Sequence, residues 1–188
     1  MIFMDNVLYQ AFFSLYFFLP AFIANPAAVI TKGKTKMDFG KSMPDGKRIL
    51  GDGKSWGGFF GGIALGYIAG LIFSGIALIA GSPVNYSYLY YLFSIQILAL
   101  SSGSMIGDST GSFIKRRLGM RSGQNGFLLD QYPFAVIALI FIFLASPSFF
   151  YRVYWNIPAI LVIFIVTPPI HRAVNIIGYK MKRKSVPW

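Results

Sequence analysis

The sequence contains no cysteine, no glutamate and a single histidine, His171. The absence of cysteine excludes disulfide scaffolds, thiolate metal sites and cysteine nucleophiles, and one histidine excludes a site built from several. Charged residues make up only 12% of the 188 residues, whereas soluble domains carry about 25%. This deficit argues against a soluble globular enzyme, and the 55% hydrophobic content argues against a disordered chain. The composition therefore predicts an integral membrane protein.

Apolar runs of about 20 residues predict an all-α, polytopic membrane protein with five transmembrane helices. The runs lie at about 6–30, 57–80, 86–107, 131–150 and 153–177, and a short turn around residues 146–148 joins the last two. We find no soluble domain or long linker between these runs. The sequence also shows no internal inverted repeat of the kind found in transporters. We therefore expect a single membrane domain over residues 1–188.

Positive charge gathers in the segments between these runs, and the formal net charge is +11. Lysine and arginine lie in the loops 31–56 and 108–130 and after residue 171, with Arg152 as the one exception. Five spans put these three segments on the same side, so the positive-inside rule predicts an outside N-terminus and a cytoplasmic C-terminus. All aspartates except Asp5 lie on that side as well. We expect a multi-pass protein of the cell membrane, with its polar site facing the cytoplasm.

The second span carries glycines at strict four-residue spacing, namely Gly58, Gly62, Gly66 and Gly70. Such a ridge lets another helix approach closely. The alternative is a groove that admits a lipid chain.

Two carboxylates mark the second cytoplasmic loop. Asp108 ends the third span and Asp130 begins the fourth, so antiparallel packing is expected to bring them to the same depth. Unpaired carboxylates there would repel each other and lose hydration, and Mg²⁺ held by oxygen ligands would relieve that. The alternative is that they form membrane-edge salt bridges with Arg116 or Arg117.

Small residues and cations follow Asp108. We expect the backbone amides of residues 109–112 to face phosphate oxygens, and three consecutive cations, Lys115, Arg116 and Arg117, come next. Carboxylates, small residues and cations together indicate a polyphosphate site.

The first cytoplasmic loop supports this hypothesis. Residues 41–58 alternate cations with glycines, although Arg48 stands where a Walker A motif needs glycine. The alternative is a solvated loop held to anionic lipid headgroups. An amide, Asn25, lies near the cytoplasmic end of the first span and either caps a broken helix or faces the nucleotide. His171 and Lys182–Lys184 are predicted to be interfacial.

These residues resemble a known family. The stretch from Gly107–Asp108 through Ser112–Arg117 to Leu129–Gln131 is similar to the signature of the CTP-dependent phosphatidate cytidylyltransferases (CDP-diacylglycerol synthases). It resembles in particular their shorter archaeal branch, the CDP-archaeol synthases, which also show a loop like residues 41–58. The resemblance spans most of the chain.

The resemblance implies transfer of a cytidylyl group from CTP to unsaturated archaetidic acid (2,3-di-O-geranylgeranylglyceryl 1-phosphate), giving CDP-archaeol and pyrophosphate. Asp108 and Asp130 match the family's metal-binding acids, for which we expect Mg²⁺, and Ser112, Lys115 and Arg116 match its Ser-x-x-Lys-Arg core. We expect Asp108, Asp130, Lys115 and Arg116 to be catalytic. The expected substrate-binding residues are Asn25, Lys41, Asp45, Lys47, Arg48, Asp52, Lys54, Ser112 and Arg117.

Departures from the diacylglycerol enzymes favour the archaeal substrate. Arg121–Ser122 replaces their Lys-Asp, and Gly126–Leu128 replaces their His-Gly-Gly. The expected partners are CTP, an isoprenoid ether lipid phosphate and the bilayer, without nucleic acid. The rival hypothesis is a small membrane transporter or channel for an anionic solute, which would want ionisable residues at mid-span, and the sequence has none there.

Overall fold

The computed structural model describes residues 6–79 and 86–183, with the backbone alone for residues 86–93. Over these residues the fold is helical, with two isolated β-bridges in the first loop and no β-strand. The helices are α1 (Val7–Ile30), α2 (Trp56–Ile79), α3 (Tyr86–Arg117), α4 (Leu128–Gln131), α5 (Pro133–Ala145), α6 (Pro147–Val153) and α7 (Ile157–Lys180).

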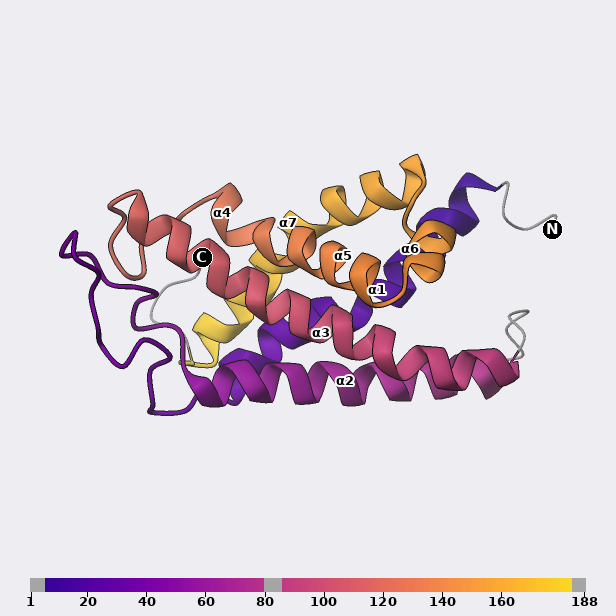
Figure 1. Ribbon diagram of the computed structural model, residues 1–188, viewed down its shortest axis with the longest axis horizontal. Coiled ribbons are helices and arrows are strands. Elements are labelled where there is room, and N and C mark those ends of the chain that lie inside the picture. Colours follow the sequence, from indigo (N-terminus) through magenta and orange to yellow (C-terminus); the bar gives the residue numbers. More distant parts are fainter. Residues whose placement is uncertain (1–5, 80–85, 184–188) are drawn as a thin grey trace.

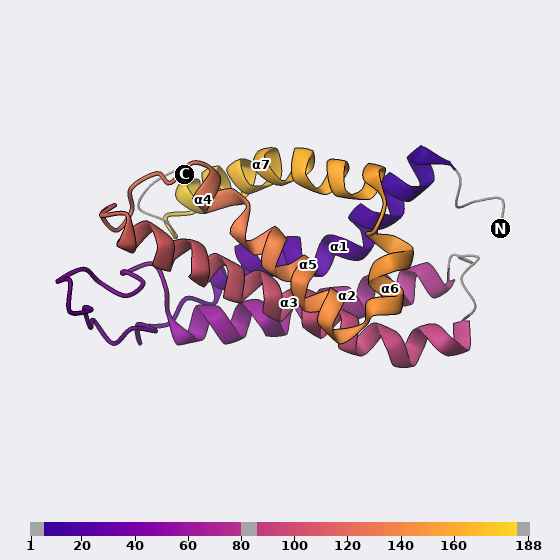
Figure 2. The same ribbon diagram turned by 45° about the horizontal axis from the view of Figure 1, so that its top comes forward.

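The longer helices form one elongated bundle. In Figure 1, α1, α2, α3, α5 and α7 extend along the long axis, and the turned view of Figure 2 shows the same arrangement. The loop 31–55 and the C-terminal ends of α3 and α7 lie at one end of the bundle, whereas α6 and the start of α1 lie at the other. The fold thus collects the cationic segments at a single end.

Within the described residues, three helices are long and apolar enough to cross a membrane, namely α1, α2 and α7, each of 24 residues. They agree with the predicted runs at 6–30, 57–80 and 153–177 to within a few residues. Asn6 and Asn156 cap the first turns of α1 and α7, because their side-chain Oδ1 atoms accept hydrogen bonds from backbone N–H groups. Pro20 and Pro26 lie inside α1.

The predicted run at 131–150 is not one helix. The structure divides it into α4, α5 and α6, and α5 has only 13 residues. Pro147 causes the break after Ala145, because proline lacks an N–H and disfavours helical backbone in the residue before it. Pro133 and Pro147 each open a new helix instead.

The third predicted run is too short. Helix α3 continues ten residues beyond 107, to Arg117, so much of the expected loop 108–130 is helical. The hydroxyls of Ser109, Thr110 and Ser112 donate to backbone carbonyls four residues earlier, and the polar stretch therefore stays compatible with a helix.

The glycine ridge of α2 is a packing surface. Gly58, Gly62, Gly66 and Gly70 are its buried residues. A Cβ at Gly62 would lie 2.8 Å from the Ala24 carbonyl oxygen, and one at Gly66 would lie 2.8 Å from Ser101 Oγ. Helices α1 and α3 therefore fill the space along the ridge, which confirms the packing interpretation over the lipid groove.

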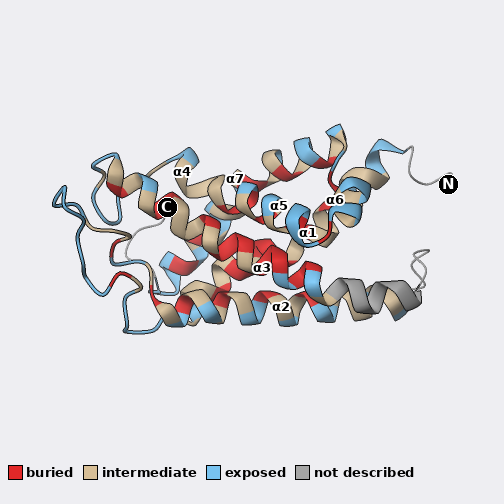
Figure 3. Cartoon of the chain, in the orientation of Figure 1, coloured by how far each residue is buried: buried red, intermediate tan, exposed pale blue. Residues whose placement is uncertain are grey.

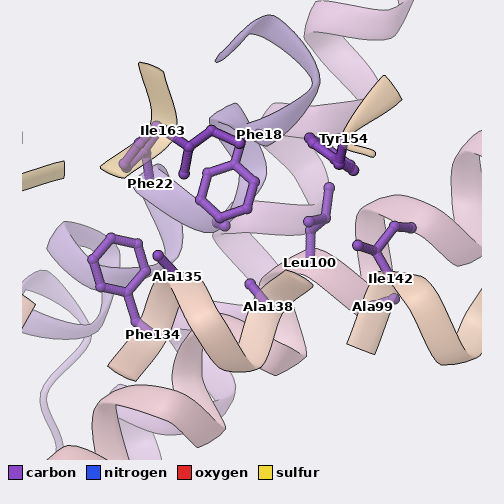
Figure 4. Packing of buried hydrophobic residues seen from close by; sticks show 11 residues of the cluster. Phe18, Phe22, Ala99, Leu100, Phe134, Ala135, Ala138, Ile142, Tyr154 and Ile163 are labelled. Atoms are coloured by element: carbon purple, nitrogen blue, oxygen red, sulfur yellow. The ribbon is translucent and has the colours of Figure 1, made fainter. Parts of the chain in front are cut away.

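The buried core lies where α1, α3, α5 and α7 meet. Phe18 and Phe22 of α1 pack with Leu100, Phe134 and Ile163, and Tyr154 closes the cluster (Figure 4). Figure 3 shows buried residues concentrated in the middle of α3, whereas much of α2 and the loop 31–55 is exposed. The core holds α3 rigidly between its neighbours, and α3 in turn carries the polar residues at its end.

Candidate functional site

A cavity of about 410 Å³ lies at the end of the bundle that carries the cationic loops. Its wall comes from α1, α2, α3, α4 and α7 and from both loops. It brings together many of the residues that the sequence singles out, namely Asn25, Asp52, Lys54, Asp108, Ser112, Lys115, Arg116 and Asp130.

Asp108 is paired with a lysine that lies 54 positions earlier. The Nζ atom of Lys54 donates to Asp108 Oδ2, and the two side chains are 19% and 24% exposed. Lys54 ends the first loop just before α2, so this ion pair ties the loop to α3. Asn25 lies on the α1 side of the same cavity and donates to Ser104 Oγ at 3.2 Å.

Asp130 is held in the same way from the other side. Lys115 Nζ donates to Asp130 Oδ1, and the Gly126 amide donates to Oδ2 at 2.5 Å. Lys115 follows Asp108 by two helical turns on α3, whereas Asp130 lies on α4. Both carboxylates therefore border one cavity, although they come from different helices.

A second glycine series, which the sequence analysis missed, brings these helices together. A Cβ at Gly111 would lie 2.6 Å from the Leu129 carbonyl oxygen, and one at Gly107 would lie 2.6 Å from Phe134 Cα. These two residues flank Asp108, and Leu129 precedes Asp130. The close approach of α3 to α4 and α5 thus sets how far apart the two carboxylates lie.

The structure combines features of both hypotheses for the carboxylates. They form ion pairs, but with Lys54 and Lys115 and not with Arg116 or Arg117. They also line one cavity, as a shared cation site requires. Within the described residues no three His, Cys, Asp or Glu side chains converge. The donors are hard oxygens, which suits Mg²⁺ when phosphates complete its coordination.

Arg116 is the buried cation of the cavity, with 6% exposure. Among the described residues its Nε has no hydrogen-bond partner and no carboxylate pairs with it. Asp130 and Asp52 act on its charge only at longer range, and a buried guanidinium without a directly paired carboxylate is energetically unfavourable. The cavity is therefore strongly attractive to anions at this point.

The two loops meet beside Arg116. Gly51 has φ of 104°, and a Cβ there would lie 3.3 Å from Arg116 Nη1 and 3.2 Å from Ser122 Oγ. The Asp52 amide donates to the Ser122 hydroxyl at 3.1 Å. Ser122 and the neighbouring Gln124 line the cavity, and the sequence analysis assigned neither to the site.

Five predicted substrate-binding residues do not line the cavity, namely Lys41, Asp45, Lys47, Arg48 and Arg117. Arg117 donates to Asp45 at 2.7 Å and to the carbonyls of Arg48 and Lys47 at 2.6 and 3.2 Å. Lys47 Nζ donates back to the Arg117 carbonyl at 2.9 Å. Asp45, Lys47, Arg48 and Arg117 thus form a clasp that fastens the first loop to the end of α3. Lys41 is exposed.

Asp38 organises the first loop, a role that the sequence analysis missed. It is 5% exposed. Its carboxylate accepts from the Arg48 guanidinium at 2.8 Å and from the amides of Gly40, Leu50 and Gly51 at 3.1 Å each. The amides that a phosphate-binding loop would offer to its ligand therefore bind the chain's own carboxylate.

These contacts determine the ionisation of Asp38. Burial acts to raise its pKa, but the hydrogen bonds from Arg48 and the backbone amides outweigh burial and lower the pKa well below its usual value. Asp38 is therefore ionised across the physiological range, as is each aspartate paired in the same loop. Every described aspartate, namely Asp38, Asp45, Asp52, Asp108 and Asp130, forms an ion pair.

Helix α7 supplies a wall that the sequence analysis treated as interfacial. His171, Val174 and Asn175 of α7 line the cavity, and so does Arg183, which follows the helix. His171 Nδ1 lies 3.1 Å from Asn175 Nδ2, and its ring stacks on Phe134 at 5.8 Å between centroids. The available signal was the four-residue spacing of His171 and Asn175, which places both polar residues on one face of the predicted span.

The expectation for residues 109–112 is wrong. Their amides lie within α3 and serve its own hydrogen bonds, and the hydroxyls of Ser109, Thr110 and Ser112 bond back to the helix. The anion-attracting groups of the site are therefore side-chain cations and not a backbone cradle.

An apolar helical bundle with candidate membrane spans, and a cavity that combines carboxylates with cations at one end, define a membrane-embedded protein built to bind a polyanion at its surface. The model of the CarS-like family, described as CDP-archaeol synthase, matches residues 4–188. The chain belongs to this family.

Similar proteins agree over nearly the whole length. The chain is 50% identical to the CDP-archaeol synthase of Picrophilus torridus over 186 residues, covering 98% of this chain and 100% of that one. It is 41% identical to the CDP-archaeol synthase of Pyrococcus horikoshii, covering 97% and 98%. A solved structure of "an intramembrane enzyme for archaeal membrane lipids biosynthesis" is 34% identical, with a TM-score of 0.68 and coverage of 91% and 95%.

Proposed function

We propose that this chain is a CTP-dependent cytidylyltransferase that makes CDP-archaeol and pyrophosphate from CTP and unsaturated archaetidic acid. The observation that carries the proposal is the cavity in which Asp108 and Asp130 face Lys54, Lys115 and Arg116. Family membership and the curated relatives named CDP-archaeol synthase support the same reaction. They favour it over the transport of an anionic solute.

The reaction is an in-line displacement. An oxygen of the lipid phosphate attacks the α-phosphorus of CTP, a new P–O bond forms, and the bond to the β-phosphate breaks, releasing pyrophosphate. Such a step needs placement and charge neutralisation more than proton transfer. Lys115 and Arg116 act as catalytic cations on the transferring phosphate, and Lys54 neutralises the triphosphate.

Asp108 and Asp130 would hold Mg²⁺ as the cofactor of the reaction. When bound, the ion supplies positive charge to the phosphate oxygens and favours departure of pyrophosphate. The remaining cavity residues, Asn25, Asp52 and Ser112, orient the substrates. We assign Asp45, Lys47, Arg48 and Arg117 to keeping the first loop in place over the site.

We further propose one membrane domain with five spans, an outside N-terminus and a cytoplasmic C-terminus. The gathering of cationic segments at one end of the bundle supports this orientation (Figure 1). Helices α1, α2, α3 and α7 would cross fully, and α5 with α6 would make the fourth crossing. CTP then arrives from the cytoplasm while the lipid keeps its chains in the bilayer.

The proposal is tested with purified protein, Mg²⁺, CTP labelled in its cytosine and 2,3-di-O-geranylgeranylglyceryl 1-phosphate. Wild type is expected to transfer label into lipid, and Asp108→Asn and Asp130→Asn to lose at least about a thousandfold in rate, because each removes charge that acts in the transition state. Asp45→Asn is the matched control, since Asp45 lies outside the cavity, and it should lose far less.

The outcomes are distinct. Release of pyrophosphate without labelled lipid would show another acceptor. If neither pyrophosphate nor labelled lipid forms and all variants are folded, the proposed cytidylyltransferase activity is rejected. The transporter hypothesis would then be favoured.

A further inference from the structure

The lysine pairs of the cavity differ in kind from the ion pairs of the scaffold. Lys54 holds Asp108 and Lys115 holds Asp130, and all four side chains are largely withdrawn from solvent. Asp38, by contrast, is fixed by the guanidinium of Arg48 and by backbone amides. A guanidinium fork holds a carboxylate in one geometry, whereas an ammonium is a compact charge on a flexible stem. Lysine therefore suits a position where the partner must change.

A divalent cation that enters the cavity alone meets an obstacle. It reaches Asp108 or Asp130 only by displacing an ammonium group, and the displaced lysine stays in a cavity that also contains the buried Arg116. Asp52 is no substitute partner, because Lys36 and Arg48 already pair with it. Binding of the bare cation therefore concentrates positive charge in a partly buried cavity.

A nucleotide that enters alone meets the opposite obstacle. Its phosphates find Lys54 and Lys115 engaged and two carboxylates beside them. If cation and nucleotide enter together, the carboxylates receive the cation and the lysines receive the phosphates. This arrangement matches the usual behaviour of Mg²⁺, which binds to one or two carboxylates and completes its coordination with substrate phosphates and water.

We propose that Lys54 and Lys115 occupy the carboxylates in place of the metal ion in the ligand-free protein, and that they exchange these partners for phosphates when metal and nucleotide bind. The inference rests on the proposed function for the identity of the nucleotide. It makes metal and nucleotide binding cooperative, and each ligand raises the affinity for the other by the same factor, about ten- to a hundredfold.

The test separates the two ligands. Mn²⁺ binding to the purified full-length protein is followed by the electron paramagnetic resonance signal of the free ion, without nucleotide, and CTP binding is measured by calorimetry in EDTA. Lys54→Met and Lys115→Met each free one carboxylate, and both should bind Mn²⁺ about tenfold more tightly than wild type and CTP about tenfold more weakly. The opposite signs are the signature of a lysine that exchanges partners.

Two further variants keep the test decisive. Lys41→Met is the control, because it removes an ammonium from an exposed residue that does not line the cavity, and its Mn²⁺ affinity should equal that of wild type. Lys54→Arg keeps the pair with Asp108 but replaces the ammonium by a fork, so it should fold normally and bind Mn²⁺ more weakly than wild type.

The results also separate this inference from the proposed function. Mn²⁺ affinities of the Met variants equal to wild type, or lower, would overturn the inference. Tighter Mn²⁺ binding with no change in CTP binding would support the occupation of the carboxylates by lysine and reject CTP as the ligand.

Discussion

Arg116 and Arg117 are neighbours on α3, yet they belong to two different regions of the molecule. Arg117 is part of the clasp, where its guanidinium donates to Asp45 and to two carbonyls and lies 5.3 Å over the Phe113 ring. Arg116 faces the cavity without a carboxylate partner among the described residues. Consecutive residues on a helix point in different directions, so Arg117 stabilises the first loop whereas Arg116 faces the cavity, where a ligand can bind.

Stability and binding therefore depend on different polar groups in this protein. The clasp and the Asp38 cluster satisfy their charges within the chain, so they order a long loop that lacks regular secondary structure. The cavity leaves charge unsatisfied or held by exchangeable lysines. This is the pattern expected when a site is preorganised for an anion and tolerates some instability without it.

The largest expected effect comes from removing each arginine in turn. Arg116→Met should lower kcat/KM for CTP by about a hundred- to a thousandfold, because it removes a cation from the transition state, while the ligand-free protein melts at the same temperature or higher. Arg117→Met should instead lower the free energy of unfolding by about 1–2 kcal/mol, because it breaks the clasp. Melting curves and steady-state rates on both variants measure this. A loss of stability in Arg116→Met would contradict the contrast.

A substitution outside the carboxylates can change the distance between Asp108 and Asp130. Gly111→Ala places a methyl group against the Leu129 carbonyl, which forces α4 away from α3 and shifts Asp130 relative to Asp108. We expect a fall of about a hundredfold in the rate of cytidylyl transfer, as for a displacement of about 1 Å in an active site.

The control for Gly111→Ala lies on α2. A Cβ at Gly75 would meet nothing within 4 Å, so Gly75→Ala should keep full activity and gain up to about 1 kcal/mol of helix stability. Equal rates for the two variants would mean that the close approach of α3 and α4 does not position the site.

The smallest effects concern the first loop. Asp38→Asn removes the charge that Arg48 and three amides share, and we expect local opening of residues 36–54 to become easier by about 2 kcal/mol. Hydrogen exchange of these amides, followed by mass spectrometry, measures the change. Unaltered exchange would show that the clasp alone orders the loop.

The same carboxylate gives the loop a defined pH dependence. The folded pKa of Asp38 is lowered, so its contribution to stability is fully present above the unfolded value of about 4. The contribution is lost as the pH falls below that value, since only the unfolded loop readily takes up the proton. Loop opening in wild type should therefore become easier in acid, and Asp38→Asn should lack that part of the change.

The apolar parts of the fold could be predicted because each span is local in the sequence. The runs at 6–30, 57–80 and 153–177 agree with α1, α2 and α7. The run at 131–150 could not be assigned correctly from hydropathy, because the chain breaks at Pro147 for backbone reasons. Residues 108–117 were expected to form a loop because they are polar, yet their hydroxyls bond within α3.

The polar site was harder to predict, because its contacts join distant segments. That Asp108 and Asp130 lie near each other could be inferred from the loop that connects their helices. That Lys54 pairs with Asp108, and that Arg117 turns to Asp45, depends on how the first loop folds over α3. The sequence around Asp38 contains no pattern that would distinguish a buried aspartate at the centre of a loop from one exposed to solvent.

The pairing of every described aspartate has a consequence for how a solute is gathered at this surface. Among the described residues, Lys32, Arg116 and Arg183 line the cavity and form no direct ion pair with a carboxylate. A bilayer with anionic headgroups depletes dissolved anions from the adjacent water, at a surface potential of about −30 mV. The cationic mouth of the bundle reverses that field locally, so nucleotide capture should slow as ionic strength rises.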